Sequence, residues 1–169
     1  PSARAGGLRS DVVQRLDDTQ AQVAIFDGRD SPDHYLWGEL ARQLGAQEAM
    51  RPFWQNGPKA PGKEHWKEMI GDRPTLILFD ELPPYFLEAR TMPVGQGSMV
   101  DVLTRALSNL FVAALELPRC CVVLANLSDS YREQVKEVSK LVADVQREAS
   151  RQAKNTTHVS LEASEVYSI

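Results

Sequence analysis

Two acidic residues, Asp80 and Glu81, follow an apolar run and are the strongest candidates for chemistry in the sequence. The run from Leu76 to Phe79 predicts a buried strand, and open α/β sheets bind ligands at the carboxyl ends of their parallel strands. One carboxylate there could hold Mg²⁺, and the other could orient and deprotonate an attacking water. The alternative is a strand that simply ends in two acidic turn residues.

A second polar residue, Asn126, ends the next apolar run along the chain, 120–125. Four apolar residues followed by Asp-Glu are the Walker B pattern of P-loop ATPases, and in such enzymes a polar residue on the next strand contacts the γ-phosphate or the water as a sensor. In this interpretation Asp80 binds Mg²⁺, Glu81 is the catalytic base and Asn126 is the sensor. The alternative for Asn126 is a turn residue, since Asn is common in turns.

The segment from Gly57 to Glu64 fits G-x-x-x-x-G-K, the pattern that starts a Walker A loop. Its residues, however, are not suited to binding phosphate. No apolar strand precedes it. Pro58 and Pro61 lack the backbone N–H groups that would bind phosphate. Glu64 replaces the Ser or Thr that binds Mg²⁺. The segment is therefore interpreted as an exposed loop.

Two arginines, Arg147 and Arg151, lie one helical turn apart and share a helix face. They could act as arginine fingers that reach the nucleotide of a neighbouring subunit. The alternative, which the pattern favours, is a solvated basic face.

The tryptophans are interpreted as packing residues. Cys120 and Cys121 are adjacent, so in a strand they would point to opposite faces.

Buried strands are expected to alternate with helices, which favours a parallel sheet covered on both sides. The apolar runs predict strands at 23–26, 75–79 and 120–125, and a weaker one at 158–162. Helical spacing predicts helices at 11–18, 64–70, 99–117 and 131–153, and one that starts at Ser31-Pro32 and ends at Gly45. Pro and Gly indicate loops at 52–62 and 91–98.

Composition sets the limits of function. The 169 residues are 43% hydrophobic and carry a net charge of −4, which fits one globular domain and gives no broad basic field for indiscriminate nucleic-acid binding. No apolar run is long enough to cross a bilayer, the start of the chain lacks an apolar signal core, and no zinc-ligand spacing is present. A cytoplasmic protein without a membrane partner is expected.

In order and spacing the motifs resemble a family of large bacterial and archaeal AAA-type ATPases. That family is filed as a domain of unknown function and is similar to the ATPase of phage-growth-limitation and BREX-type defence islands. The resemblance covers about residues 20–169, and the segments that carry it are 23–28, 36–45, 61–63, 76–82 and 148–153.

The resemblance implies a P-loop NTPase core, α/β with a parallel sheet sandwiched by helices, that binds and hydrolyses ATP with Mg²⁺. Residues 1–19 would be an N-terminal arm or helix and 20–169 a partial core without its first strand and P-loop. Its partners would be the remainder of the same polypeptide, which carries the P-loop, and further copies or defence proteins. DNA involvement stays open. This chain alone is expected not to hydrolyse ATP. The alternative is a non-catalytic interaction module that retains the Walker B strand as architecture.

Overall fold

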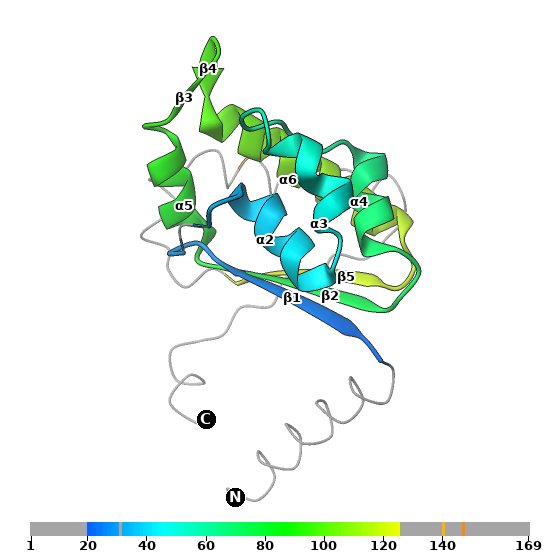
Figure 1. Ribbon diagram of the computed structural model, residues 1–169. Helices are drawn as coiled ribbons and strands as arrows, with labels where there is room; N and C mark the ends of the chain where they lie inside the picture. Colours follow the sequence, from blue (N-terminus) through cyan, green and yellow to red (C-terminus); the bar gives the residue numbers. More distant parts are fainter. Residues whose placement is uncertain (1–19, 31, 126–139, 141–146, 148–169) are drawn as a thin grey trace, which may run out of the picture.

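The central feature of the fold is a three-stranded parallel sheet. The computed structural model describes residues 20–30, 32–125, 140 and 147. The strands are β1 (Gln22–Asp27), β2 (Thr75–Asp80) and β5 (Cys120–Ala125), in the order β1-β2-β5 (Figure 1). The described part of the chain is therefore α/β, with the Asp80 strand in the middle.

The register of the sheet places the three strand ends side by side. Asp27 pairs with Asp80, and Asp80 pairs with Ala125. Side chains alternate between the two faces along each strand. Asp27 and Asp80 therefore lie at the same edge of the sheet and on the same face.

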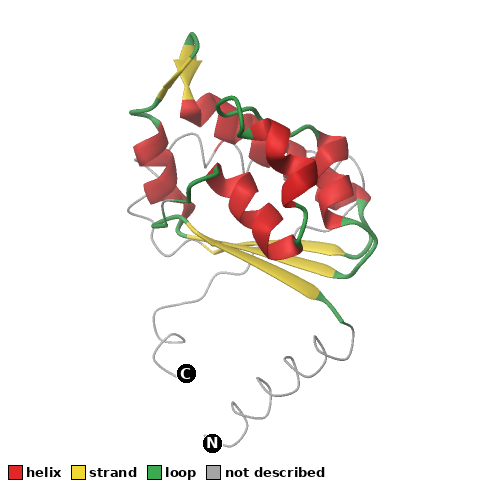
Figure 2. Cartoon of the chain, in the orientation of Figure 1, coloured by secondary structure: helices red, strands yellow, loops and turns green. Residues whose placement is uncertain are grey.

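Helices of the described residues cover one face of the sheet (Figure 2). The connection from β1 to β2 contains α2 (Tyr35–Leu44), the short α3 (Gln47–Met50) and η1 (Arg51–Phe53), and α4 (Lys63–Ile70). The connection from β2 to β5 contains α5 (Leu82–Ala89), the hairpin strands β3 (Pro93–Val94) and β4 (Gly97–Ser98), and α6 (Met99–Glu116). Both connections return over the same face because the chain moves across the sheet in one direction and crossovers are right-handed.

The hydrophobic core lies between this helix layer and the sheet. Phe26 and Phe79 come from neighbouring strands, and Phe79 contacts Phe111 of α6 edge-on with ring centroids 6.4 Å apart. Trp37 and Trp66 are fully buried, and each indole N–H donates to a backbone carbonyl, that of Phe53 or Ala106. These two tryptophans are packing residues, as predicted.

The strands predicted at 23–26, 75–79 and 120–125 are confirmed, with β1 one residue longer at each end and β2 extended to Asp80. The helix expected from Ser31 begins only at Tyr35, with His34 as the residue before its first turn. It ends at Gly45, as predicted, and Gly45 has the left-handed conformation. Helix α5 was not predicted from the sequence, although its prolines occupy the first turn, where their missing N–H groups cost nothing. The predicted elements at 11–18 and 158–162 lie outside the described residues, and of 131–153 only Lys140 and Arg147 are described, both helical.

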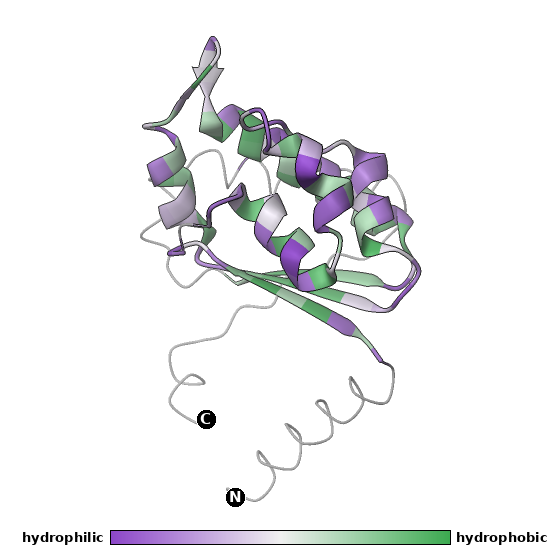
Figure 3. Ribbon diagram, in the orientation of Figure 1, coloured by the Kyte–Doolittle hydropathy of each residue, from purple (hydrophilic) through white to green (hydrophobic). Residues whose placement is uncertain are grey.

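The second face of the sheet is apolar and is not covered by any helix of the described residues. Val23, Ile25 and Val123 are 40%, 50% and 40% exposed. Figure 3 shows the strands mostly in the hydrophobic colour, whereas the helices alternate between the two colours. Helices were expected on both faces of the sheet, and the described residues place helices on one face. Among the described residues, no helix is long and apolar enough to span a membrane.

Candidate functional site

The candidate site is built on the carboxyl end of the central strand, where β2 ends at Asp80 and the next residue turns away. Glu81 has φ 47° and ψ 46°, the left-handed conformation, and α5 begins directly after it. An L-residue other than Gly, Asn or Asp adopts this conformation uncommonly. The turn separates the two acidic residues, so Asp80 stays with the strand and Glu81 belongs to the strand–helix junction.

Gly28 and Glu81 form a close backbone contact at this edge. The Gly28 N–H donates to the Asp80 carbonyl oxygen at 2.7 Å, which extends the sheet hydrogen bonding beyond β1. A Cβ atom at Gly28 would lie 1.9 Å from the Glu81 carbonyl oxygen. No side chain fits there, so glycine allows the turn after β1 to pack against the turn that carries Glu81.

Arg29 pairs with Glu81 at the same junction. Arg29 Nε makes an ion pair with Glu81 Oε2, and the Glu81 side chain is 16% exposed whereas that of Arg29 is 64% exposed. The oxygen accepts no hydrogen bond of regular geometry from the described residues, so the contact is electrostatic. The Asp27 carboxylate in turn accepts a hydrogen bond from the Arg29 backbone N–H at 2.8 Å, which fixes the start of this turn.

Asp80 carries the feature that points most directly to a ligand. Its Oδ1 atom is buried and has no hydrogen-bond partner among the described residues. A buried carboxylate oxygen without a partner loses its hydration without compensation, which costs free energy. Such groups mark sites where an ion, a water or a ligand completes the hydrogen bonding.

The donor set at this edge fits Mg²⁺ in one respect. Mg²⁺ keeps several waters and uses one or two carboxylates together with substrate phosphates, so a dedicated cage of protein ligands is not required. Asp80 and Asp27 supply oxygen atoms at neighbouring positions. In the described part of the chain, no group of three or more His, Cys, Asp or Glu side chains gathers to hold a metal on its own. The described residues would thus offer a cation two carboxylates at this edge.

The other predicted site residues are only partly placed. Asn126 and Arg151 lie outside the described residues, although β5 ends at Ala125, level with Asp80. Arg147 is helical and exposed. The sequence analysis missed Arg29 and Asp27 as site residues. Asp27-Gly28 carried a signal, because it ends an apolar strand as Asp80 does, whereas nothing in the sequence connects Arg29 to Glu81.

The glycine- and proline-containing segment at 57–64 does not form a phosphate loop. No strand precedes it, and its last residues, Lys63 and Glu64, begin α4. Lys63 Nζ donates to Glu116 Oε1 at 2.8 Å, and Lys59 is exposed. The prediction of an exposed loop is confirmed only in part, because Lys59 is exposed whereas Pro61 is buried and Lys63 is paired with a carboxylate at the end of α6.

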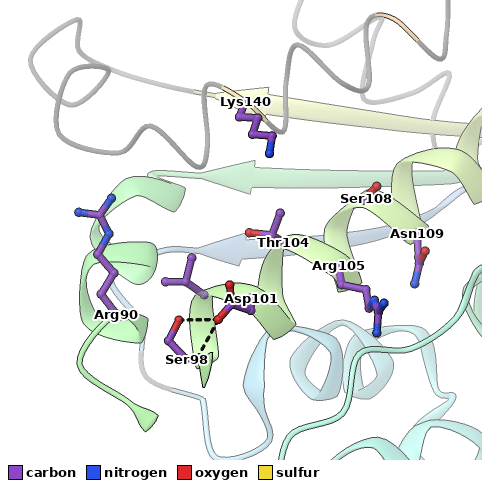
Figure 4. A pocket seen from close by; sticks show the side chains of 9 residues that line it. Arg90, Ser98, Asp101, Thr104, Arg105, Ser108, Asn109 and Lys140 are labelled. Carbon is purple, nitrogen blue, oxygen red and sulfur yellow. Dashed lines mark hydrogen bonds between the residues drawn. The ribbon is translucent and has the colours of Figure 1, made fainter. Parts of the chain in front are cut away.

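A pocket of about 560 Å³ lies along the outer side of α6 and is separate from the acidic edge (Figure 4). Most of its lining residues have polar side chains, and Asp80 and Glu81 are not among them. The α6 residues that line it recur at helical spacing, and Lys140 faces them from across the pocket. Asp101 already accepts hydrogen bonds from Ser98 N and Oγ, at 2.8 and 3.1 Å, which hold its pKa below the usual value. We therefore place the candidate site at the strand ends and not in this pocket.

Comparisons with protein-family models, with curated proteins and with solved structures found no match for this chain. The class that the described residues define is thus a parallel α/β domain with an acidic site at the carboxyl end of its central strand.

Proposed function

We propose that this chain is the Walker B part of an AAA-type ATPase core that acts in a large defence-type ATPase. The observation that carries the proposal is the buried Asp80 Oδ1 without a partner, at the carboxyl end of the central parallel strand. Strand ends at this position are where open α/β sheets bind nucleotides. The resemblance of the motifs to that ATPase family supports the same assignment.

Each residue at the edge has a part in this proposal. Asp80 would hold Mg²⁺ through its buried oxygen, directly or through water. Bound Mg²⁺–ATP supplies the phosphoryl group and the positive charge that stabilises its transfer. Glu81 would accept the proton of the attacking water. Asn126 would act as the sensor. Arg147 and Arg151 are candidates for arginine fingers toward a neighbouring subunit, with a solvated basic face as the alternative that the pattern favours.

The ion pair of Glu81 with Arg29 has a direct consequence for this role. The Arg29 guanidinium lies against Oε2, one of the two oxygens that could accept the proton of the attacking water. Arg29 is largely exposed, so it can leave without breaking the core. We propose that Glu81 acts as base only when nucleotide draws it away from Arg29.

The proposal requires a phosphate-binding loop from the remainder of the polypeptide, because the segment at 57–64 is not one. The first experiment is to read the gene upstream of this chain for G-x-x-x-x-G-K-[ST]. Its presence supports the ATPase. Its absence would favour the non-catalytic interaction module that keeps the Walker B strand as architecture.

The second experiment measures ATP turnover by the polypeptide that contains both the loop and this chain. Asp80→Asn keeps the side-chain shape but removes the charge that holds Mg²⁺, so turnover should fall by at least about 10²-fold. Asp72→Asn makes the same charge change in an exposed turn and serves as the control. Equal turnover by the two variants would contradict the metal-binding role of Asp80.

A further inference from the structure

The uncovered face of the sheet presents a regular apolar surface. Two rows of paired residues cross all three strands on this face: Val23, Leu76 and Cys121, and then Ile25, Leu78 and Val123. Sheets made only of parallel strands are buried on both faces in nearly all known folds. A contiguous apolar surface of this kind is typical of an interface.

The described connections cannot supply that cover, because right-handed crossovers place all of them over the other face. Lys140 follows β5 in the sequence, and it lines the pocket beside α6 on the helix side. Lys140 itself therefore lies beside the helix layer. Of the residues outside the described ranges, those before β1 join the sheet directly through Gln20.

The chain before β1 has the pattern, the length and the connection that this face requires. Leu8, Val12 and Leu16 recur every four residues and form one apolar stripe, while Gln14 lies on the opposite side. A helix over residues 8–19 would be about 18 Å long, close to the roughly 20 Å of a six-residue strand.

The turn into β1 is fixed at the edge of the sheet. Gln20 has φ 51°, the left-handed conformation that is common in turns, and its carbonyl accepts a hydrogen bond from Arg73 Nη2 at 3.4 Å. A turn at Gln20 would let the preceding residues run back across the uncovered face. We propose that residues 8–19 form an amphipathic helix that packs its leucine and valine stripe on the uncovered face of the sheet.

Cys121 is a native reporter of this contact, because it lies in the first apolar row and is exposed among the described residues. The experiment uses the full chain with Cys120→Ala, so that one thiol remains. The rate of maleimide labelling of Cys121 is followed by mass spectrometry in the native and in the urea-unfolded chain. The proposal expects labelling at least ten times slower in the native chain.

Leu16→Asp should raise the native rate at least tenfold by displacing the helix, and Gln14→Asp should leave it within twofold. Fluorescence of the buried Trp37 and Trp66, which lie on the other side of the sheet, reports whether the rest of the fold survives. Fast labelling of the parent chain, or equal rates for the two variants, would overturn the proposal.

A cross-link decides the question if Leu16→Asp loses the fold. In the same background, Leu16→Cys should be joined to Cys121 within one chain by a short bismaleimide, whereas Gln14→Cys should not. Absence of the Leu16→Cys cross-link overturns the proposal. Cross-links between chains, or labelling that speeds up on dilution, would show that a second copy covers the face instead and would also overturn it.

Discussion

The backbone of Gly28 lies directly against the backbone of Glu81, so that the turn after β1 and the turn after β2 form one packed unit. This contact holds the left-handed conformation of Glu81. It also brings Arg29, the residue after Gly28, to the Glu81 carboxylate. The position of the candidate base is thus set by a glycine in the turn after the neighbouring strand.

Gly28→Ala is expected to lower the free energy of unfolding by about 1–3 kcal/mol, because its Cβ would meet the Glu81 carbonyl at 1.9 Å and the backbone must move. Urea unfolding of the full chain measures the change. Gly62→Ser is the control, since Gly62 precedes α4 with ordinary dihedral angles and the nearest atom to its added Cβ, His65 Nδ1, lies 3.3 Å away. Equal stability of both variants would show that the junction tolerates a side chain.

Glu81→Gln in the polypeptide that carries the phosphate loop is expected to abolish turnover while ATP binding remains. An amide cannot accept the proton of water, and loss of a general base costs about 10²–10⁴-fold. Gln keeps nearly the same volume, so the junction and the metal site should survive. Turnover and equilibrium ATP binding are measured on the same preparation, and near-parent turnover would remove Glu81 from the mechanism.

Mixing of subunits tests the arginines. If Arg147 or Arg151 is a finger, its Ala variant should turn over ATP poorly alone and recover when mixed with Glu81→Gln subunits, because each variant supplies what the other lacks. The ATPase rate of the mixture is compared with the sum of the separate rates. A mixture that only reaches that sum would favour a solvated basic face.

Lys63→Ala is expected to leave ATP turnover unchanged, because Lys63 pairs with Glu116 and does not belong to a phosphate loop. Hydrogen bonds from Lys63 and Lys67 hold the pKa of Glu116 below its ordinary value. This cluster is at the surface, so the loss in the free energy of unfolding should be small. Lys59→Ala, at an exposed position of the same segment, is the control. A large loss of nucleotide affinity in Lys63→Ala alone would restore the Walker A interpretation.

The ionisation of buried Tyr85 is expected to make the free energy of unfolding depend on pH in the alkaline range. Burial raises the pKa of Tyr85 to about 12, against about 10 in an unfolded chain. The folded state holds this proton more tightly, so the contribution is fully present below pH 10 and is lost as pH rises toward 12. The free energy of unfolding of Tyr85→Phe should fall less steeply with pH over this range. The variant should also be less stable by about 1 kcal/mol at neutral pH, because it lacks the hydroxyl that accepts a hydrogen bond from Leu36 N at 3.2 Å.

Urea unfolding at pH 9 to 11.5 measures this difference. Both proteins carry Cys120→Ala, because burial raises the pKa of the Cys120 thiol to about 11 and it would titrate in the same range. Parallel pH profiles for the two proteins would show that Tyr85 ionises as it would in water.

The sequence by itself determined the strands and most of the helices. The runs at β1, β2 and β5 are apolar and short, and Gly45 and Gly71 end helices where the pattern placed turns. Helix α5 was not predicted, because Pro83 and Pro84 suggest a turn unless the helix starts immediately before them. The position of Asp80 and Glu81 at a strand end also follows from local pattern alone.

Only the tertiary structure decided what surrounds those two carboxylates. Arg29 and Glu81 are far apart in the sequence, and their pairing depends on the parallel register that aligns Asp27 with Asp80. Lys63 matched a local phosphate-loop pattern, yet its partner is Glu116 at the far end of another helix. Periodicity reports which face of an element is apolar, but the contacts between charged residues depend on how the elements pack, and no local pattern encodes that.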